Sequence, residues 1–148
     1  MTFITNDVSD LSGDFNWIKP TQPKAKIYTP AFQIETTAVG SQYVPPVQGA
    51  QVLNVTNAIL TLVNSNAGPV ITNHVILSAK NKVTNDPTLS TNKLTFSLTV
   101  SSGLFSGKVA DPQNGLPYQF KGVLFQKQNA GFGYFLNPTQ SAPVYFGP

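Results

Sequence analysis

Apolar and polar side chains alternate along much of the chain. Between residues 94 and 100, apolar side chains at every second position are separated by Thr and Ser. A period of two places these two kinds of side chain on opposite faces of a β-strand. Further strand-like segments are Tyr118–Gln126, Ala58–Val63, Phe105–Val109, Val75–Ala79, Ala31–Val39, Phe132–Leu136, Val52–Val55, Phe15–Ile18 and Val144–Phe146.

These segments predict an all-β fold, which is an antiparallel sandwich or barrel of about 9–10 short strands with a C-terminal meander. Helices are not expected, because 11 Gly and 12 Pro recur so often that few windows of about twelve residues escape both.

One hairpin of this fold can be placed with its register. The segment Asp111–Gly115 contains Asp-Pro and Asn-Gly pairs, which favour a reversal of the chain. The predicted pairs are Phe105 with Phe120, Gly107 with Tyr118 and Gly103 with Gly122, and a slip of one or two positions stays open. Glycines opposite aromatic residues leave room for a ring lying across the strand, so we expect a strongly twisted hairpin.

This hairpin and the strands beside it form the predicted meander. Its four strands are Leu94–Val100, Leu104–Val109, Tyr118–Gln126 and Phe132–Leu136, with a tight turn at Gln128 and Asn129. Within the third strand, Val123–Phe125 is a continuous apolar run, which is typical of a central strand covered on both faces.

Segments rich in Pro, Gly and Asn predict the loops. These are Lys19–Pro23, Gly40–Gly49, Asn64–Pro69 and Asn81–Asn92. Residues 1–13 carry no strand pattern and are interpreted as a tail or connector, and residues 14–148 as a single all-β domain. No signal peptide is visible in residues 1–14, and we expect a module cut from a longer chain.

The charged residues exclude several classes of function. The chain has nine Lys, six acidic residues, one His and no Cys, so neither a metal site nor a cofactor is expected. The net charge of +3 does not predict nucleic-acid binding, because the chain has no Arg for bidentate contacts. No long apolar segment predicts membrane insertion. Asn, Gln, Ser and Thr make up 49 of the 148 residues, and such an uncharged polar surface suits an extracellular setting.

Several strings resemble a β-rich module found toward the C-terminus of large secreted or surface proteins of environmental bacteria. They are Gly13–Trp17, Leu94–Leu98, Gly103–Gly107, Phe120–Gln128 and Gly131–Leu136, so the resemblance covers about Gly13 to Gly147. It implies a location outside the cell or at its surface, and a role as one part of a larger protein. It implies no chemistry and no site residues.

No catalytic residues stand out, so we predict that the protein is not an enzyme. Glu35 is the one acidic residue in a strand pattern, and an exposed carboxylate is the expectation. The alternative is a buried Glu35 that assists a covalent bond between a Lys and an Asn. His74 begins a strand pattern, and without a Gly-x-Ser-x-Gly segment it is expected to be structural rather than part of a Ser-His-Asp nucleophile.

Trp17, Phe132 and Tyr134 are the candidate ligand-binding residues, since they lie near predicted loops or strand ends. Exposed rings can stack on sugars while neighbouring Asn and Gln amides bind hydroxyl groups. Packing in the core is the competing interpretation for these rings. The sequence therefore leaves two functions open. One is a non-enzymatic extracellular module for adhesion, assembly or spacing, and the other is a carbohydrate-binding module. The expected partners are other protein domains or surface glycans.

Overall fold

The fold is all β, as predicted. The computed structural model describes residues 6–63, 70–137 and 140–148, and no α-helix occurs among them. The strands are β1 (Leu11–Lys19), β2 (Phe32–Gly40), β3 (Asn57–Leu62), β4 (Ile71–Leu77), β5 (Val83–Asn85), β6 (Leu94–Thr99), β7 (Leu104–Ala110), β8 (Pro117–Phe125), β9 (Ala130–Leu136) and β10 (Ser141–Gly147). A 3-10 turn, η1 (Gln126–Gln128), joins β8 to β9.

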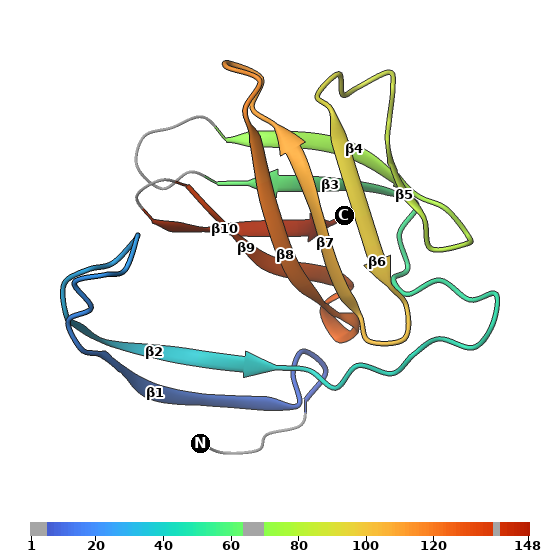
Figure 1. The fold of residues 1–148 in the computed structure, drawn as a ribbon. Helices are drawn as coiled ribbons and strands as arrows, with labels where there is room; N and C mark the ends of the chain where they lie inside the picture. The colour runs from blue at the N-terminus through green and yellow to red at the C-terminus, as the bar shows by residue number, and fades with distance from the viewer. Residues whose placement is uncertain (1–5, 64–69, 138–139) are drawn as a thin grey trace.

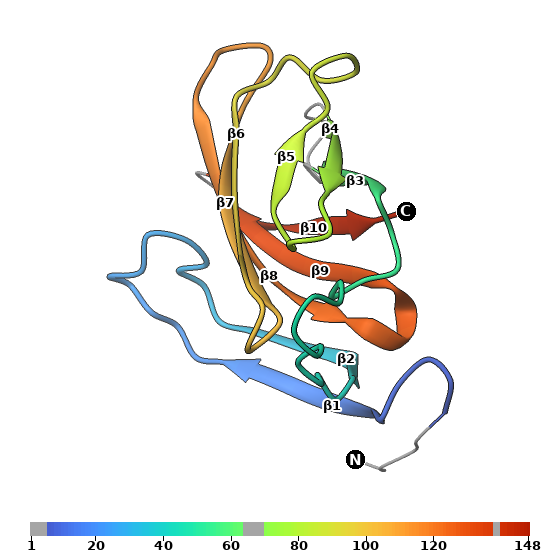
Figure 2. The same cartoon turned by 90° about the vertical axis from the view of Figure 1, so that its right-hand side faces the viewer.

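The strands form two antiparallel sheets (Figures 1 and 2). β1 and β2 make a separate hairpin, and the other eight strands form one sheet in the order β5-β4-β3-β10-β9-β8-β7-β6. The edge strands β5 and β6 lie beside each other, so this sheet curls into a nearly closed barrel. β6 to β9 are the predicted meander, and β10 follows it by inserting between β9 and β3.

Three strand predictions need correction. Residues 52–55 form no strand, although Val52 and Leu53 are buried in the core. β5 lies inside the stretch expected to be a loop over residues 81–92. β1 begins at Leu11, a few residues before the strand expected from Phe15. The loop expected over residues 64–69 lies outside the described residues.

The β7–β8 hairpin is two positions away from the predicted register. Phe105 lies opposite Gly122, and Gly107 lies opposite Phe120. The difference arises in the turn, which is centred one residue later than predicted and is closed by a hydrogen bond from the Asp111 N–H to the carbonyl of Leu116 at 2.9 Å. The role expected for the glycines is confirmed, because the Phe120 ring lies where a Cβ of Gly107 would be, and the Phe105 ring does the same at Gly122.

These rings form the aromatic part of the barrel core. Phe96, Phe105, Phe120 and Phe146 have ring centroids 5.0 to 6.3 Å apart. Aliphatic side chains of β3, β4 and β10 complete the interior, and they are Leu60, Leu62, Val75, Leu77 and Val144. The inward-facing glycines therefore make the space that the rings occupy.

The apolar run in β8 is not covered on both faces, so that expectation was wrong. Leu124 is buried, but Val123 points away from the core and is 40% exposed. In the described part of the chain, β8 contacts chiefly β7 and β9, its neighbours in the sheet, and its outward side chains Gln119, Lys121 and Val123 are exposed. An apolar strip is consequently left on the outside of the barrel.

A buried amide lies where the barrel closes. The side chain of Asn73 on β4 is 0% exposed and points into the core. Its amide donates to Asn85 Oδ1 on β5 at 2.9 Å and accepts from Asn92 Nδ2 in the β5–β6 connection at 3.3 Å. These bonds connect β4 and β5 to the segment that leads into β6, and so they link the two edges of the sheet, β5 and β6, which are not paired with each other.

Candidate functional site

The candidate site is the outer face of the meander, which we define as the side chains of β7, β8 and β9 that point away from the core. Strand pairing arranges them and their neighbours in rows across the sheet. One row is apolar and contains Leu104, Val123, Phe132 and Tyr145. The next contains Ser106, Lys121, Tyr134 and Pro143, and beside it lie Lys108, Gln119 and Leu136.

The two candidate rings on this face have different surroundings. Phe132 is 37% exposed, and its ring packs against Phe125 at 5.5 Å and Tyr145 at 5.8 Å between centroids. Tyr134 is 50% exposed and lies directly opposite Lys121 of β8. Phe132 thus belongs to a small aromatic cluster, while Tyr134 offers more open ring surface to a ligand.

Tyr134 lines a shallow hollow on the outer face. The other lining residues are Pro117, Gln119, Lys121 and Leu136. A second hollow over β6, β7 and β8 shares Gln119 and Lys121 with the first. The two hollows therefore adjoin, with one amide and one ammonium group at their common border.

The charge on this face is uniformly positive. Lys108 and Lys121 are both exposed, and neither has an ion-pair partner among the described residues. The rows of the outer face contain no Asp or Glu. An anion that approaches these rows therefore meets two unpaired ammonium groups and no carboxylate that would repel it.

Trp17 lies in a different sheet from Phe132 and Tyr134. It is on β1 and 53% exposed, and its ring contacts Phe32 of β2 at 5.8 Å. Phe15 and Ile34 lie on the same side of the hairpin, since Ile34 pairs with Trp17 and Phe15 is two residues away. The structure thus brings Phe132 and Tyr134 together on one strand and places Trp17 on the hairpin.

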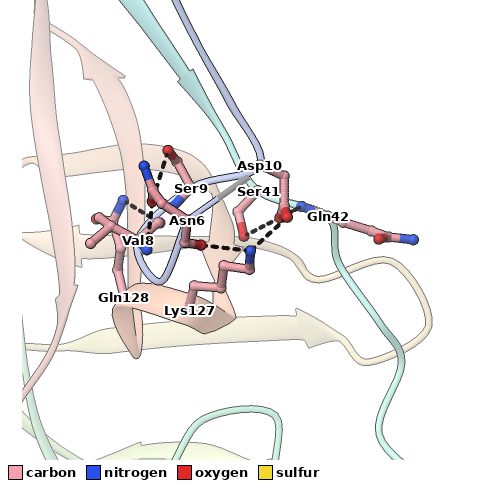
Figure 3. A network of polar contacts seen from close by, with 8 residues as sticks. All are labelled: Asn6, Val8, Ser9, Asp10, Ser41, Gln42, Lys127 and Gln128. Carbon is pink, nitrogen blue, oxygen red and sulfur yellow. Dashed lines mark hydrogen bonds and ion pairs between the residues drawn. The ribbon is translucent and has the colours of Figure 1, made fainter. Parts of the chain in front are cut away.

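Polar contacts attach the base of the hairpin to η1 (Figure 3). Lys127 Nζ forms an ion pair with Asp10 Oδ1 at 2.6 Å and donates to the carbonyl of Asn6 at 2.8 Å. The Asp10 carboxylate also accepts from the N–H of Gln42 at 2.8 Å. The hydrogen bond from Lys127 and then that from Gln42 lower the pKa of Asp10. At the other end of the hairpin, Tyr28 Oη accepts from the Ser141 N–H at 2.7 Å.

The residues considered for catalysis have structural surroundings. Glu35 is exposed on β2, so it is not the buried acid that a Lys–Asn bond would need. His74 is exposed, and its backbone N–H rather than its imidazole donates to Ser90 Oγ at 2.6 Å. Asp86 accepts from Thr88 in a turn, which lowers the pKa of Asp86. Among the described residues, no group of three His, Cys, Asp or Glu could hold a metal ion.

Sequence reasoning did not single out Lys121 and Gln119. The alternation around Phe120 already places both on the outward side of β8. The alternation does not show that Tyr134 lies beside Lys121, because only the β8–β9 register places these two residues opposite each other.

Comparisons with protein family models, curated proteins and solved structures found no match for this chain. In the part of the chain that the structure describes, no helix combines the length and the apolar character needed to cross a membrane.

Proposed function

We propose that the chain is a non-enzymatic interaction module of an extracellular bacterial protein, serving adhesion or assembly. The observation that carries this proposal is the uncovered apolar strip of Leu104, Val123 and Phe132 with Tyr134 beside it. Contiguous apolar surface on a soluble domain commonly marks an interaction site. A pure spacer needs no such surface, so adhesion or assembly is favoured over spacing.

The surroundings of the titratable groups support a role without catalysis. Asp111 is buried in the β7–β8 turn, where its carboxylate accepts from the Gln113 N–H at 2.9 Å and from Asn114 Nδ2 at 2.8 Å. Asp10 and Asp86 are likewise engaged in contacts that hold loops. Carboxylates used in this way hold the backbone in place, and their oxygens are occupied by neighbouring donors, so they are not arranged as general acids or bases beside a substrate.

Carbohydrate binding is a second candidate, favoured by the hollow beside Tyr134. An open phenol ring can stack on the apolar side of a sugar, and the Gln119 amide can bind hydroxyl groups at its edge. The expected site therefore centres on Tyr134, with Phe132 beside it. Trp17 would make a separate contact surface on the hairpin.

Two measurements test the outer face as the binding surface. One is co-sedimentation of the chain with insoluble cellulose, chitin, starch and xylan, and the other is self-association by sedimentation velocity at about 100 µM. We expect at least one of them to be positive and to be lost in Tyr134→Ala combined with Val123→Ser. Trp17→Ala is the control, because this ring lies in the separate hairpin. The proposal would be refuted if the protein bound none of these glycans and stayed monomeric. It would also be refuted if the outer-face variant bound or self-associated as strongly as the unmodified protein.

A further inference from the structure

The hollow beside Tyr134 combines an aromatic ring with unneutralised positive charge. Lys121 lies between Ser106 and Tyr134 in one row, about 5 Å from each along the hydrogen-bonding direction. Lys108 is a diagonal neighbour of Lys121 on the adjacent strand, about 7–8 Å away at the backbone. Two ammonium groups and one ring therefore lie within the reach of a few linked sugar residues.

From this arrangement we infer that the outer face of the meander binds an acidic polysaccharide, a chain of hexuronic acid residues. The inference rests on the proposed carbohydrate-binding function and adds the class of sugar. Tyr134 stacks on one sugar ring, Lys121 and Lys108 pair with uronate carboxylates, and Gln119 binds hydroxyl groups.

Charge distinguishes this ligand from a neutral glycan. A neutral sugar offers the ammonium groups only uncharged hydroxyl acceptors, whereas a uronate carboxylate forms the stronger hydrogen bonds between two ionised groups. The absence of Asp and Glu from the same rows removes the repulsion that an acidic chain would otherwise meet. A lysine ammonium suits this role, because it acts as a point charge and does not require the planar geometry of an arginine.

A matched pair of ligands tests the inference. Binding of the intact chain to polygalacturonate and to its fully methyl-esterified form is measured by calorimetry at about 50 mM NaCl. We expect the methyl-esterified polysaccharide to bind at least about tenfold more weakly than polygalacturonate, since esterification removes the carboxylate charge and keeps the sugar backbone. Binding to polygalacturonate is expected to weaken severalfold at about 300 mM NaCl because the site is exposed.

Matched variants locate the site. Lys121→Gln and Lys108→Gln should each weaken binding about three- to tenfold, Tyr134→Ala about tenfold or more, and Tyr134→Phe much less because the ring remains. Lys80→Gln is the control, since Lys80 is exposed in the β4–β5 turn and has the same charge. Thermal unfolding checks that these surface variants keep the fold.

Four outcomes would overturn the inference. Equal binding of both polygalacturonate forms would show a neutral-glycan site, and the proposed function would survive. An equal loss in Lys80→Gln would show nonspecific attraction to the net positive charge. Tighter binding of single-stranded DNA through the same lysines would point to a nucleic acid. Binding to neither polysaccharide would overturn the inference. The proposed role in assembly would then still be tested by the self-association measurement.

Discussion

Removing the buried amide of Asn73 is expected to weaken the closure of the barrel. Asn73→Ala leaves Asn85 Oδ1 without its donor and Asn92 Nδ2 without its acceptor. An unpaired buried polar group costs about 1–3 kcal/mol; Asn85 and Asn92 are both half-buried, and the longer bond to Asn92 contributes less. The expected loss is about 2–4 kcal/mol, a large part of the 5–15 kcal/mol that holds a typical domain together.

The assay is urea unfolding followed by far-ultraviolet circular dichroism, which reports on the sheet. Fluorescence is unsuitable because the one Trp, Trp17, lies exposed in the separate hairpin. Thr72→Ala is the control, since Thr72 precedes Asn73 on β4 but points to solvent, and its expected cost is below about 1 kcal/mol.

A double-mutant cycle with Asn85→Ala separates the network from general damage to β4. We expect a coupling of about 1 kcal/mol between the two positions, because each variant removes the same hydrogen bond. Additive effects within about 0.3 kcal/mol, or a single-variant loss below about 0.5 kcal/mol, would refute the view that this amide network closes the barrel.

Three further predictions concern other parts of the chain. Gly103→Ala should lower the free energy of unfolding by about 1–3 kcal/mol more than Gly115→Ala in the same assay. Both residues have positive φ, but only at Gly103 would a Cβ overlap the Tyr43 ring. Equal losses in the two variants would contradict this packing. The Asp10 carboxyl, followed by NMR, should titrate below its ordinary pKa of 3.8, so the contribution of its ion pair to stability is complete above pH 3.8 and is lost as the pH falls through the lowered value. An Asp10 pKa that is unchanged by Lys127→Met would contradict the assigned cause. The intact mass should equal the calculated mass, because the carboxylate considered for a Lys–Asn bond is exposed, and a loss of one ammonia would contradict this.

The candidate site could be predicted only in part. The sequence indicates Phe132 and Tyr134 by their places near strand ends, and their spacing of two residues puts them on one face of a strand. Trp17 fits the same description in the sequence but lies in another sheet. The sequence does not indicate Lys121 and Gln119 as site residues, because their place in the site depends on Tyr134, which the β8–β9 pairing brings beside Lys121.

Alternation of apolar and polar residues determined the all-β class, most of the strands and the meander, because a period of two is a local property of the chain. The short strand β5, the insertion of β10 beside β3 and the separation of the β1–β2 hairpin were decided by tertiary structure. The β7–β8 register belongs with them, since the loop that closes at Asp111 and Leu116 shifted the pairs by two positions. The physical reason is that strand neighbours and registers depend on how distant segments share one interior. In this chain the Phe rings fill the space left by inward-facing glycines, and that packing also determines which side chains meet outside the barrel.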